Sequence, residues 1–385
     1  MTPLPSMTIR GRTLLPIVQG GMGVGISASR LAGAVAKEGA MGTIASIDLR
    51  HHHPDLLELC KQDPTQATME AANLTALRRE ITAAKAISEG RGMVAVNVMR
   101  AVGSYAAAVK TACESGADAI VMGAGLPLDL PDLTQGVDIA LIPILSDSRG
   151  IALVLKKWLK KNRLPDAIVI EHPAHAGGHL GVANIADIPN ERFEFQRVID
   201  ETMLTFDSLG IDRAQIPLIV AGGIDSHAAV RHWLTAGASG VQLGTAFAVT
   251  QEGDAHPEFK RILADATPED IVEFVSVTGL PARAVNTPWL SRYLRNEQRI
   301  RDKIGSRPHA CPTGLNCLSA CGLRDGIEKF GHFCIDTRLA AALRGDRANG
   351  LFFRGREALP FGSAIRSVRE LLDLLILDVR PGLAA

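Results

Sequence analysis

Short runs of uninterrupted apolar residues recur along the first two thirds of the chain, and stretches with helical periodicity separate them. The runs do not alternate between apolar and polar residues, so they are typical of strands that are covered on both faces, as in a parallel sheet. Eight such runs are present, at residues 15–19, 41–46, 93–98, 119–123, 139–145, 167–171, 217–221 and 240–244. This pattern predicts alternating strands and helices, and therefore an α/β fold.

The spacing of the runs favours a closed barrel. Five of the seven intervals between run centres are 21 to 27 residues long, which suits one strand and one helix. The other two intervals are about twice as long and predict insertions near residues 47–75 and 182–210. Eight strand–helix units favour a TIM (β/α)₈ barrel over an open, doubly wound sheet.

The character of the chain changes after the eighth run. Residues 251–305 are polar and predicted to be helical, residues 306–360 are rich in Cys, Gly and Arg, and residues 363–379 predict a final amphipathic helix. We therefore expect a barrel domain at 1–290 and a C-terminal, Cys-containing helical extension at 291–385. The extension is expected to be attached to the barrel and not to form an independent globule.

Composition and charge exclude several classes of protein. The 385 residues are 46% hydrophobic, which is enough for a large core, and 41 basic residues balance 41 acidic ones. A nucleic-acid binder that acts through bulk charge would need a basic excess, so this class is disfavoured. No apolar run reaches the roughly 18 residues of a membrane span, and the N-terminus lacks the apolar region of a secretory signal. We expect a cytoplasmic protein, and the sequence does not indicate an oligomeric state.

Candidate active-site residues follow from the barrel prediction, because the active sites of such barrels lie at the C-terminal ends of the strands. Glycines and a few polar residues occupy these ends. The candidates are Gly21, Met22 and Gly23 after the first strand, Asn97 after the third, Gly123 after the fourth, and Glu171, Gly178 and His179 after the sixth.

The last two predicted strands carry the most specific signal. Gly222-Gly223 and Gly244-Thr245 follow them and would present free main-chain N–H groups on adjacent loops. Small residues let a main chain approach a phosphate closely, so this pair of loops predicts a phosphate site. The alternative is that these glycines serve tight turns alone.

The glycine-rich segment at residues 20–25 is similar to a dinucleotide-binding fingerprint. However, Ser46 stands at the end of the second predicted strand, where that fingerprint requires an acidic residue. We therefore expect the main chain at Met22 and Gly23 to approach a flat ring instead.

Histidines are concentrated after the sixth strand, where Glu171 is followed by His172, His175 and His179. A histidine on a glycine-rich loop at a barrel mouth suits proton transfer near neutral pH. A metal site or a histidine that only stabilises its own turn remain alternatives. The run at residues 51–53 is predicted to be part of a solvated insertion.

Six segments in a fixed order carry a family resemblance: PIVQGGMGVGIS, VNVM, AHAGGHLG, PLIVAGGI, VQLGTAF and TGLPARAV. Together they resemble the nitronate monooxygenase (2-nitropropane dioxygenase) family over roughly residues 10–290, and the related FMN-dependent enoyl-acyl carrier protein reductases. The resemblance implies an FMN-binding barrel. His175 departs from the family pattern, which often has an acidic or polar residue just before AGGH.

The resemblance also implies roles for individual residues. Met22, Gly23 and Asn97 resemble residues around the isoalloxazine and ribityl groups, and the glycine pairs on the last two strands resemble the phosphate site. His179 matches the histidine that acts near flavin N5. The whole set of expected FMN-binding residues is Gly21, Met22, Gly23, Asn97, Gly123, Glu171, Gly178, Gly222, Gly223, Gly244 and Thr245.

Four of the six cysteines, Cys311, Cys317, Cys321 and Cys334, fall close together in the sequence. Their last two spacings are similar to those of iron–sulfur flavoenzymes of the dienoyl reductase type. A 4Fe-4S cluster is therefore predicted, with tetrahedral zinc or reduced, buried thiols as alternatives. The arginine-rich stretch at residues 344–356 is predicted to be solvated surface, or else to recognise an acidic substrate or partner.

The leading functional hypothesis is an FMN-dependent oxidoreductase that oxidises alkyl nitronates with O₂, with His179 as its acid–base residue. The alternative is an NAD(P)H-dependent enoyl-thioester or quinone reductase that uses FMN and an iron–sulfur cluster. A third possibility is a flavin-binding barrel without catalytic activity. Small-molecule substrates are the expected partners in the first two cases.

Overall fold

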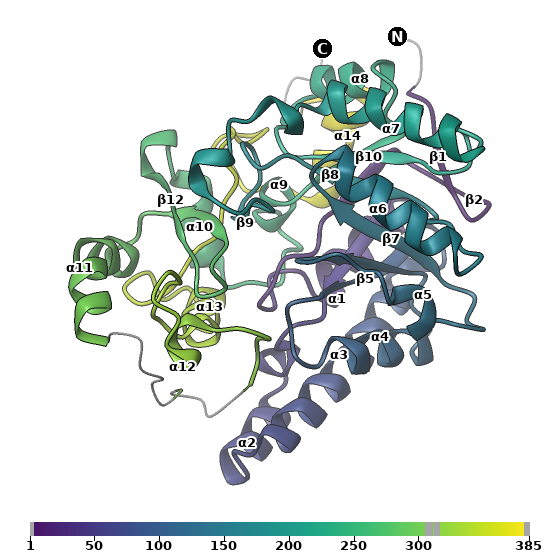
Figure 1. Cartoon of the computed structure of the whole chain (residues 1–385). Helices are drawn as coiled ribbons and strands as arrows, with labels where there is room; N and C mark the ends of the chain where they lie inside the picture. The colour runs from purple at the N-terminus through teal and green to yellow at the C-terminus, as the bar shows by residue number, and fades with distance from the viewer. Residues whose placement is uncertain (1–3, 305–310, 312–315, 381–385) are drawn as a thin grey trace.

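The computed structural model describes residues 4–304, 311 and 316–380. A two-stranded antiparallel hairpin, β1 (Met7–Ile9) and β2 (Arg12–Leu14), comes first in the chain. Met7, Ile9 and Leu14 of this hairpin are buried against apolar residues from inside the barrel that follows. The hairpin therefore covers one end of that barrel (Figure 1).

Eight parallel strands close into a barrel, as the sequence predicts. Neighbouring strands pair in the order β10-β11-β3-β4-β5-β6-β7-β8. Each of the eight predicted apolar runs is confirmed as one of these strands. The bounds are β3 (Ile17–Gln19), β4 (Met41–Ala45), β5 (Met93–Met99), β6 (Ala119–Gly123), β7 (Ala140–Leu145), β8 (Ile168–Glu171), β10 (Leu218–Ala221) and β11 (Gly240–Leu243).

Helices surround the barrel and bury the outer face of its strands. One apolar cluster, which includes Val121 and Ile219, fills the barrel interior, and a larger one lies between strands and helices. Side chains of both faces are thus removed from water, which explains the uninterrupted apolar runs. Apart from the insertion helix described next, the α-helices before β11 are α1 (Ser29–Lys37), α3 (Gln66–Ser88), α4 (Tyr105–Glu114), α5 (Leu130–Leu133), α6 (Ser148–Leu159), α7 (Phe195–Leu209) and α8 (His227–Thr235).

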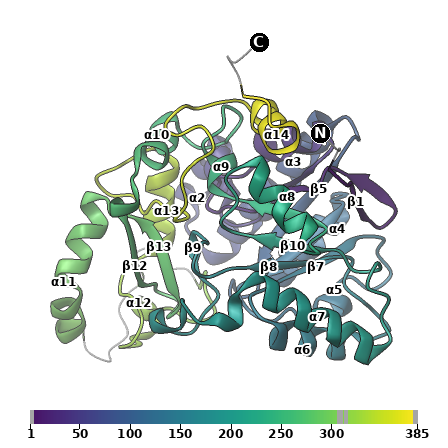
Figure 2. The ribbon, with the colours of Figure 1, turned by 90° about the horizontal axis from the view of Figure 1, so that it is seen from above.

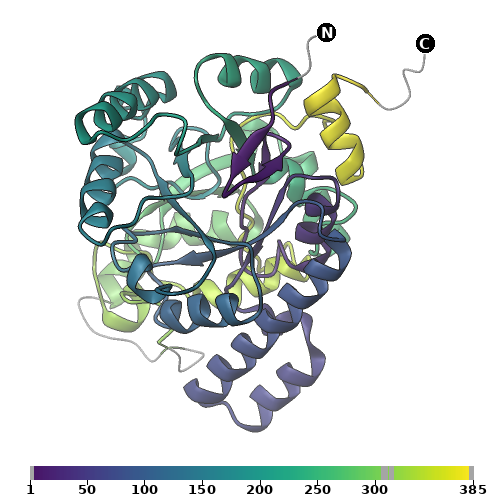
Figure 3. The ribbon, with the colours of Figure 1, turned by 90° about the vertical axis from the view of Figure 1, so that its right-hand side faces the viewer.

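The two expected insertions contain helices. After β4 come η1 (Leu49–His52), α2 (Pro54–Gln62) and the first part of α3; α2 and α3 lie side by side and project beyond the barrel (Figure 3). After β8 come the short strand β9 (Gly178–His179), η2 (Ile185–Asp187), η3 (Glu191–Phe193) and then α7.

The prediction that residues 51–53 are solvated is wrong. His52 Nε2 lies 2.7 Å from the Gly25 carbonyl oxygen, and His53 Nε2 lies 2.9 Å from a Glu80 carboxylate oxygen. His51 faces Asp336 at 3.7 Å. These three imidazoles therefore tie the insertion to the barrel and to the C-terminal residues.

The region after β11 is only partly helical, so the expectation of a helical stretch at residues 251–305 needs correction. The helices α9 (Thr245–Ala248), α10 (Pro257–Asp265) and α11 (Pro288–Ile304), with η4 (Pro268–Asp270), flank a hairpin of β12 (Ile271–Val275) and β13 (Pro281–Val285). Strand β13 also pairs with β9, so a separate three-stranded sheet stands beside the barrel (Figure 2).

The chain ends in three helices, α12 (Gly322–Asp325), α13 (Ile335–Leu343) and α14 (Val368–Leu377). The last of these confirms a helix within the predicted range 363–379. It packs against α8, α1 and α9, next to the barrel strands (Figure 2). Within the described residues, none of the helices has the combination of length and apolarity required to cross a membrane.

Candidate active site

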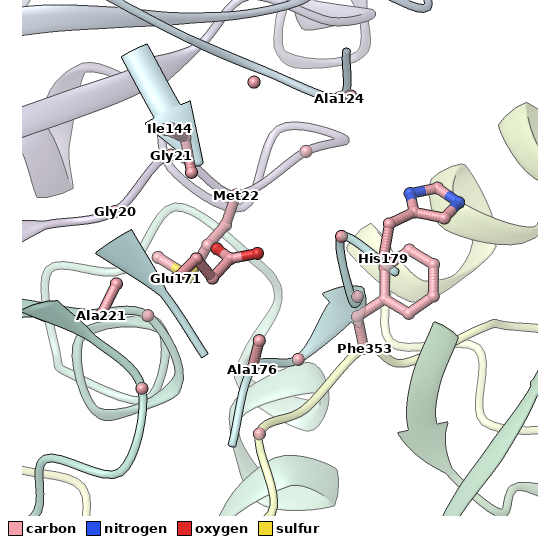
Figure 4. Close-up of a pocket in the computed structure, with 18 of the residues that line it drawn as sticks. Gly20, Gly21, Met22, Ala124, Ile144, Glu171, Ala176, His179, Ala221 and Phe353 are labelled. Carbon is pink, nitrogen blue, oxygen red and sulfur yellow. The ribbon is translucent and has the colours of Figure 1, made fainter. Parts of the chain in front are cut away.

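A cavity of about 710 Å³ opens at the C-terminal ends of the barrel strands. Its wall is mostly apolar, and it includes every residue that the sequence analysis selected as cofactor-binding or catalytic. These residues are Gly21, Met22, Gly23, Asn97, Gly123, Glu171, Gly178, His179, Gly222, Gly223, Gly244 and Thr245. Figure 4 labels Gly21, Met22, Glu171 and His179 among them. The barrel topology thus gathers one site from residues that are more than 200 positions apart.

The loop after β3 lies against the end of β5 because only glycine fits between them. A Cβ on Gly21 would lie 2.3 Å from the Asn97 Cβ, well inside van der Waals contact. The Asn97 amide donates a hydrogen bond to the Val121 carbonyl oxygen at 3.3 Å. In the same loop, the Met22 main-chain N–H donates to Ser27 Oγ at 2.9 Å. The main chain is therefore fixed and exposed to the cavity at this point.

The two glycine loops after β10 and β11 lie on neighbouring strands. Gly222 and Gly223 have φ values of +109° and +75°, which side chains rarely allow. A Cβ on Gly244 would lie 3.7 Å from the Met22 sulfur, in the space of the cavity. Thr245 follows Gly244, and its Oγ1 accepts a hydrogen bond from the Gly355 N–H at 3.0 Å. The loops form a cradle lined by main-chain atoms and one hydroxyl group.

His179 is held by residues from the later part of the chain. It stands on β9 opposite Ala282 of β13, and its Nε2 lies 2.9 Å from Ser276 Oγ. The ring of Phe353 packs beside the imidazole with centroids 5.7 Å apart (Figure 4). Burial lowers the pKa of His179 to about 4, so the ring is neutral at pH 7.

Glu171 is the last residue of β8, and its carboxyl group extends toward Met22 (Figure 4). Burial raises its pKa to about 7, because a charged carboxylate is poorly solvated at the bottom of the cavity. The cavity therefore holds an acid that is partly protonated near neutral pH, together with a neutral histidine.

The other two histidines of this segment have different surroundings. His172 is buried in the turn after β8, where its Nδ1 accepts a hydrogen bond from the Ala174 N–H at 3.1 Å. His175 borders the cavity, and its Nδ1 lies 2.6 Å from a Glu357 carboxylate oxygen. Only part of the histidine-rich segment therefore faces the site.

The model of the nitronate monooxygenase family matches residues 7–378 of the chain. The chain belongs to the nitronate monooxygenase family. It is 28% identical over 295 residues to a protein of Bacillus subtilis (strain 168) named "Probable nitronate monooxygenase", covering 74% of this chain and 79% of that one. Membership of this family makes the chain an oxidoreductase.

Solved structures also have a fold similar to that of this chain. FabK from Thermotoga maritima superimposes with a TM-score of 0.64 at 20% identity, over 94% of this chain and 91% of that one. A nitroalkane oxidase from Streptomyces ansochromogenes gives a TM-score of 0.62 at 20% identity, over 94% of each chain. At these identities the likeness concerns the barrel fold.

The predicted metal centre is not supported in this family member. The residues that the structure describes contain no group of three or more His, Cys, Asp or Glu side chains that could hold a metal ion. Cys317 lines the cavity, and burial raises the pKa of its thiol to about 12. Cys321 is buried below it, and Cys334 precedes α13. Residues 312–315, between Cys311 and Cys317, lie outside the described part of the chain.

Sequence reasoning missed several residues that shape the site. Ser276 and Phe353 contact His179, and Asp48 and Asp336 line the cavity beside Cys317. The segment TGLPARAV contains β13 of the hairpin next to Ser276, but neither this hairpin nor its pairing with β9 was predicted from the sequence. The whole arginine-rich stretch at residues 344–356 was predicted to be solvated surface, and this is wrong for Arg354, which is buried in the cavity wall.

Proposed function

We propose that this chain oxidises alkyl nitronates with O₂ and uses FMN as its cofactor. The observation that carries the proposal is one cavity that combines a two-loop glycine cradle with a neutral, half-buried histidine. Membership of the nitronate monooxygenase family supplies the reaction class.

The residues present fit FMN in shape and chemistry. A Cβ on Gly222 would come within 3.0 Å of the His175 Cβ, so the cradle exists only because glycine stands there. Free N–H groups and the Thr245 hydroxyl suit the phosphate, and the residues from Gly21 to Gly23, with Asn97, suit the flat ring and the ribityl chain. When bound, FMN supplies two-electron redox chemistry at this site.

His179 is the proposed acid–base residue. Because the ring is neutral, its unprotonated nitrogen can accept the α-proton of a neutral nitroalkane, and the N–H formed there can then donate a hydrogen bond to a nitronate oxygen. Ser276 engages Nε2, so the proton would be accepted at Nδ1. The Phe353 ring packs beside the imidazole and covers one side of it.

Glu171 is the second proposed titrating group. Its raised pKa keeps the carboxyl group partly protonated near pH 7, so it can donate a hydrogen bond to a bound ring instead of repelling an anionic substrate. We assign Glu171 to the cofactor side of the cavity because it ends the barrel strand β8 and lines the same cavity as Met22.

An anaerobic reduction experiment tests the proposal. The purified yellow protein is mixed with an alkyl nitronate or with NADH without oxygen, and the flavin absorbance is followed. The nitronate should bleach the flavin, and O₂ should restore it. Bleaching by NADH or NADPH but not by nitronates would assign the chain to the reductase alternative. A folded preparation that releases no FMN on denaturation would remove the cofactor itself.

A further inference from the structure

The structure describes three arginines whose side chains are almost completely buried: Arg50, Arg283 and Arg354. A buried guanidinium is normally neutralised by a carboxylate, because leaving a charge unpaired in the interior is costly. Arg283 pairs with Glu273 at 2.6 Å, and Arg50 pairs with Asp48. Arg354 differs from both.

Arg354 forms hydrogen bonds with neutral groups only. Its Nε donates to the Leu263 carbonyl oxygen at 2.9 Å, and its Nη1 donates to the carbonyl oxygens of Gly355 at 2.8 Å and Glu357 at 3.2 Å. Among the described residues, no carboxylate forms an ion pair with it, and Nη2 makes no hydrogen bond. Burial lowers the pKa of the guanidinium, as expected for a desolvated cation.

The carboxylate that lies nearest in sequence is engaged elsewhere. Glu357 directs its Oε1 toward His175 at 2.6 Å, and only its main-chain carbonyl reaches Arg354. No carboxylate of the described residues therefore forms an ion pair with Arg354, which is only 4% exposed, and the charges of Asp270 and Glu357 only partly offset the effect of burial on its pKa.

Arg354 lies in the wall of the cavity, next to the glycine cradle. The following residue, Gly355, donates its N–H to Thr245 Oγ1 at 3.0 Å, and the Arg356 N–H donates to the His175 carbonyl oxygen at 3.3 Å. A Cβ on Gly177 would lie 2.5 Å from the Arg354 carbonyl carbon, so the two segments are in close contact. The segment around Arg354 thus belongs to the same structure as the phosphate loops.

We propose that the Arg354 guanidinium supplies the counter-charge for the phosphate of bound FMN and makes the site select FMN over riboflavin. This inference rests on the proposed function, since it assigns a partner to the phosphate of that cofactor. A guanidinium that is already fixed by carbonyl groups loses little conformational freedom when it binds an anion. It would favour a phosphorylated flavin without weakening the contacts to the ring.

The test is a competition between two flavins that differ by the phosphate alone. The full-length protein is equilibrated with excess FMN and riboflavin in equal amounts, and the bound flavins are separated and quantified. The wild type should prefer FMN. R354Q should lower the ratio of bound FMN to riboflavin by about 10- to 100-fold, the worth of a charge-assisted hydrogen bond. R356Q is the matched control, because Arg356 is exposed in the same segment.

The ratio of bound FMN to bound riboflavin distinguishes a phosphate-binding role of Arg354 from a purely structural one. If Arg354 only braces the loop, R354Q lowers the total flavin bound but leaves the ratio unchanged, and this outcome overturns the proposal. R354M keeps the buried aliphatic stem and gives the same measurement should the glutamine variant fold poorly. A wild type that binds neither flavin refutes the proposed function itself, and one that binds both equally refutes the phosphate assignment.

Discussion

His179 and Glu171 face one cavity, and burial displaces their pKa values in opposite directions. The pKa of the imidazole falls to about 4 and that of the carboxyl group rises to about 7. Both displacements favour the uncharged form, because the cavity wall offers little solvation to charge. At neutral pH Glu171 is therefore only partly charged, which would reduce its repulsion of the anionic substrate that we propose, and His179 is neutral.

Replacement of His179 by alanine tests its assigned role. We expect H179A to retain flavin but to lose turnover by about 10²- to 10⁴-fold, the usual contribution of general acid–base catalysis. Flavin content and steady-state rates with a nitroalkane give the two measurements. H175A is the control, because His175 is paired with Glu357 at the edge of the cavity. A near-native rate in H179A would show that the proton is accepted elsewhere.

The raised pKa of Glu171 predicts a pH-dependent stability. Between pH 4.5 and about 7 the folded chain holds a proton at Glu171 that the unfolded chain has released, so this contribution is complete at low pH and is lost as pH rises. For His179 the direction is opposite, and its contribution is lost as pH falls from 6.5 toward 4. Replacement of Glu171 by glutamine should remove the first dependence.

Denaturant unfolding of the flavin-free protein at pH 5 and pH 8 measures this effect. When pH is raised from 5 to 8, the free energy of unfolding of E171Q should rise by up to about 3 kcal/mol relative to that of the wild type. This figure converts the difference between the folded and unfolded pKa values of Glu171 into free energy. Asp48 also has a raised pKa, and it is present in both proteins. Its contribution cancels when the pH dependence of E171Q is compared with that of the wild type, so the difference between them reports on Glu171. E191Q, at an exposed position, should follow the wild type.

At the scale of elements, the barrel could be read from the sequence because every strand buries both faces. The run at residues 119–123 is buried throughout, and so are β10 and β11. The hairpin of β12 and β13 after residue 251 was not predicted, because β12 is mostly half-buried and both strands pair outside the barrel. Strand β9 contains two residues and pairs with β13, a contact that no local pattern signals.

The candidate site also contains residues that could be predicted from the sequence and residues that could not. The glycines at the ends of β10 and β11 could be predicted, because their position in a barrel follows from strand order alone. Ser276 could not, since it reaches His179 across 97 residues of sequence. Phe353 and Arg354 come from later still, and an arginine-rich stretch resembles a solvated surface until the fold buries one of its members.

The cradle of β10 and β11 can be tested at Gly244. A methyl group there would make an ordinary contact at 3.7 Å with the Met22 sulfur, whereas Gly222 has a φ of +109° that alanine would strain. G244A should therefore fold normally but place a methyl group where phosphate oxygens would lie. We expect FMN affinity to fall by about 5- to 100-fold, the cost of overpacking. Fluorescence of released flavin gives the affinity, and an unchanged unfolding midpoint without flavin is the internal control.

At the scale of the molecule, the C-terminal residues enclose the site and also complete the barrel. Phe353 and Arg354 reach the cavity from one side. From there the chain returns to the outside of the barrel, where α14 packs between α1 and α8 and shares the main hydrophobic core (Figure 2). The Leu375 carbonyl oxygen lies 3.1 Å from Nδ1 of the buried His227 on α8. The last helix thus occupies a place in the ring of helices around the strands.

This arrangement predicts that the barrel requires its last helix. Truncation after Gly362 removes four buried side chains, Val368, Leu371, Leu372 and Leu375, from the core. Their burial is worth about 6–12 kcal/mol at 1.5–3 kcal/mol each, which equals most of the roughly 5–15 kcal/mol that stabilises a typical domain. We expect the truncated chain to be insoluble or to unfold at much lower denaturant concentration, although the strands and the predicted FMN residues are intact. Truncation after Arg380 keeps α14 and should leave the unfolding midpoint and the flavin content unchanged. Wild-type values for both quantities in the shorter chain would mean that α14 is an appendage and that the barrel closes without it.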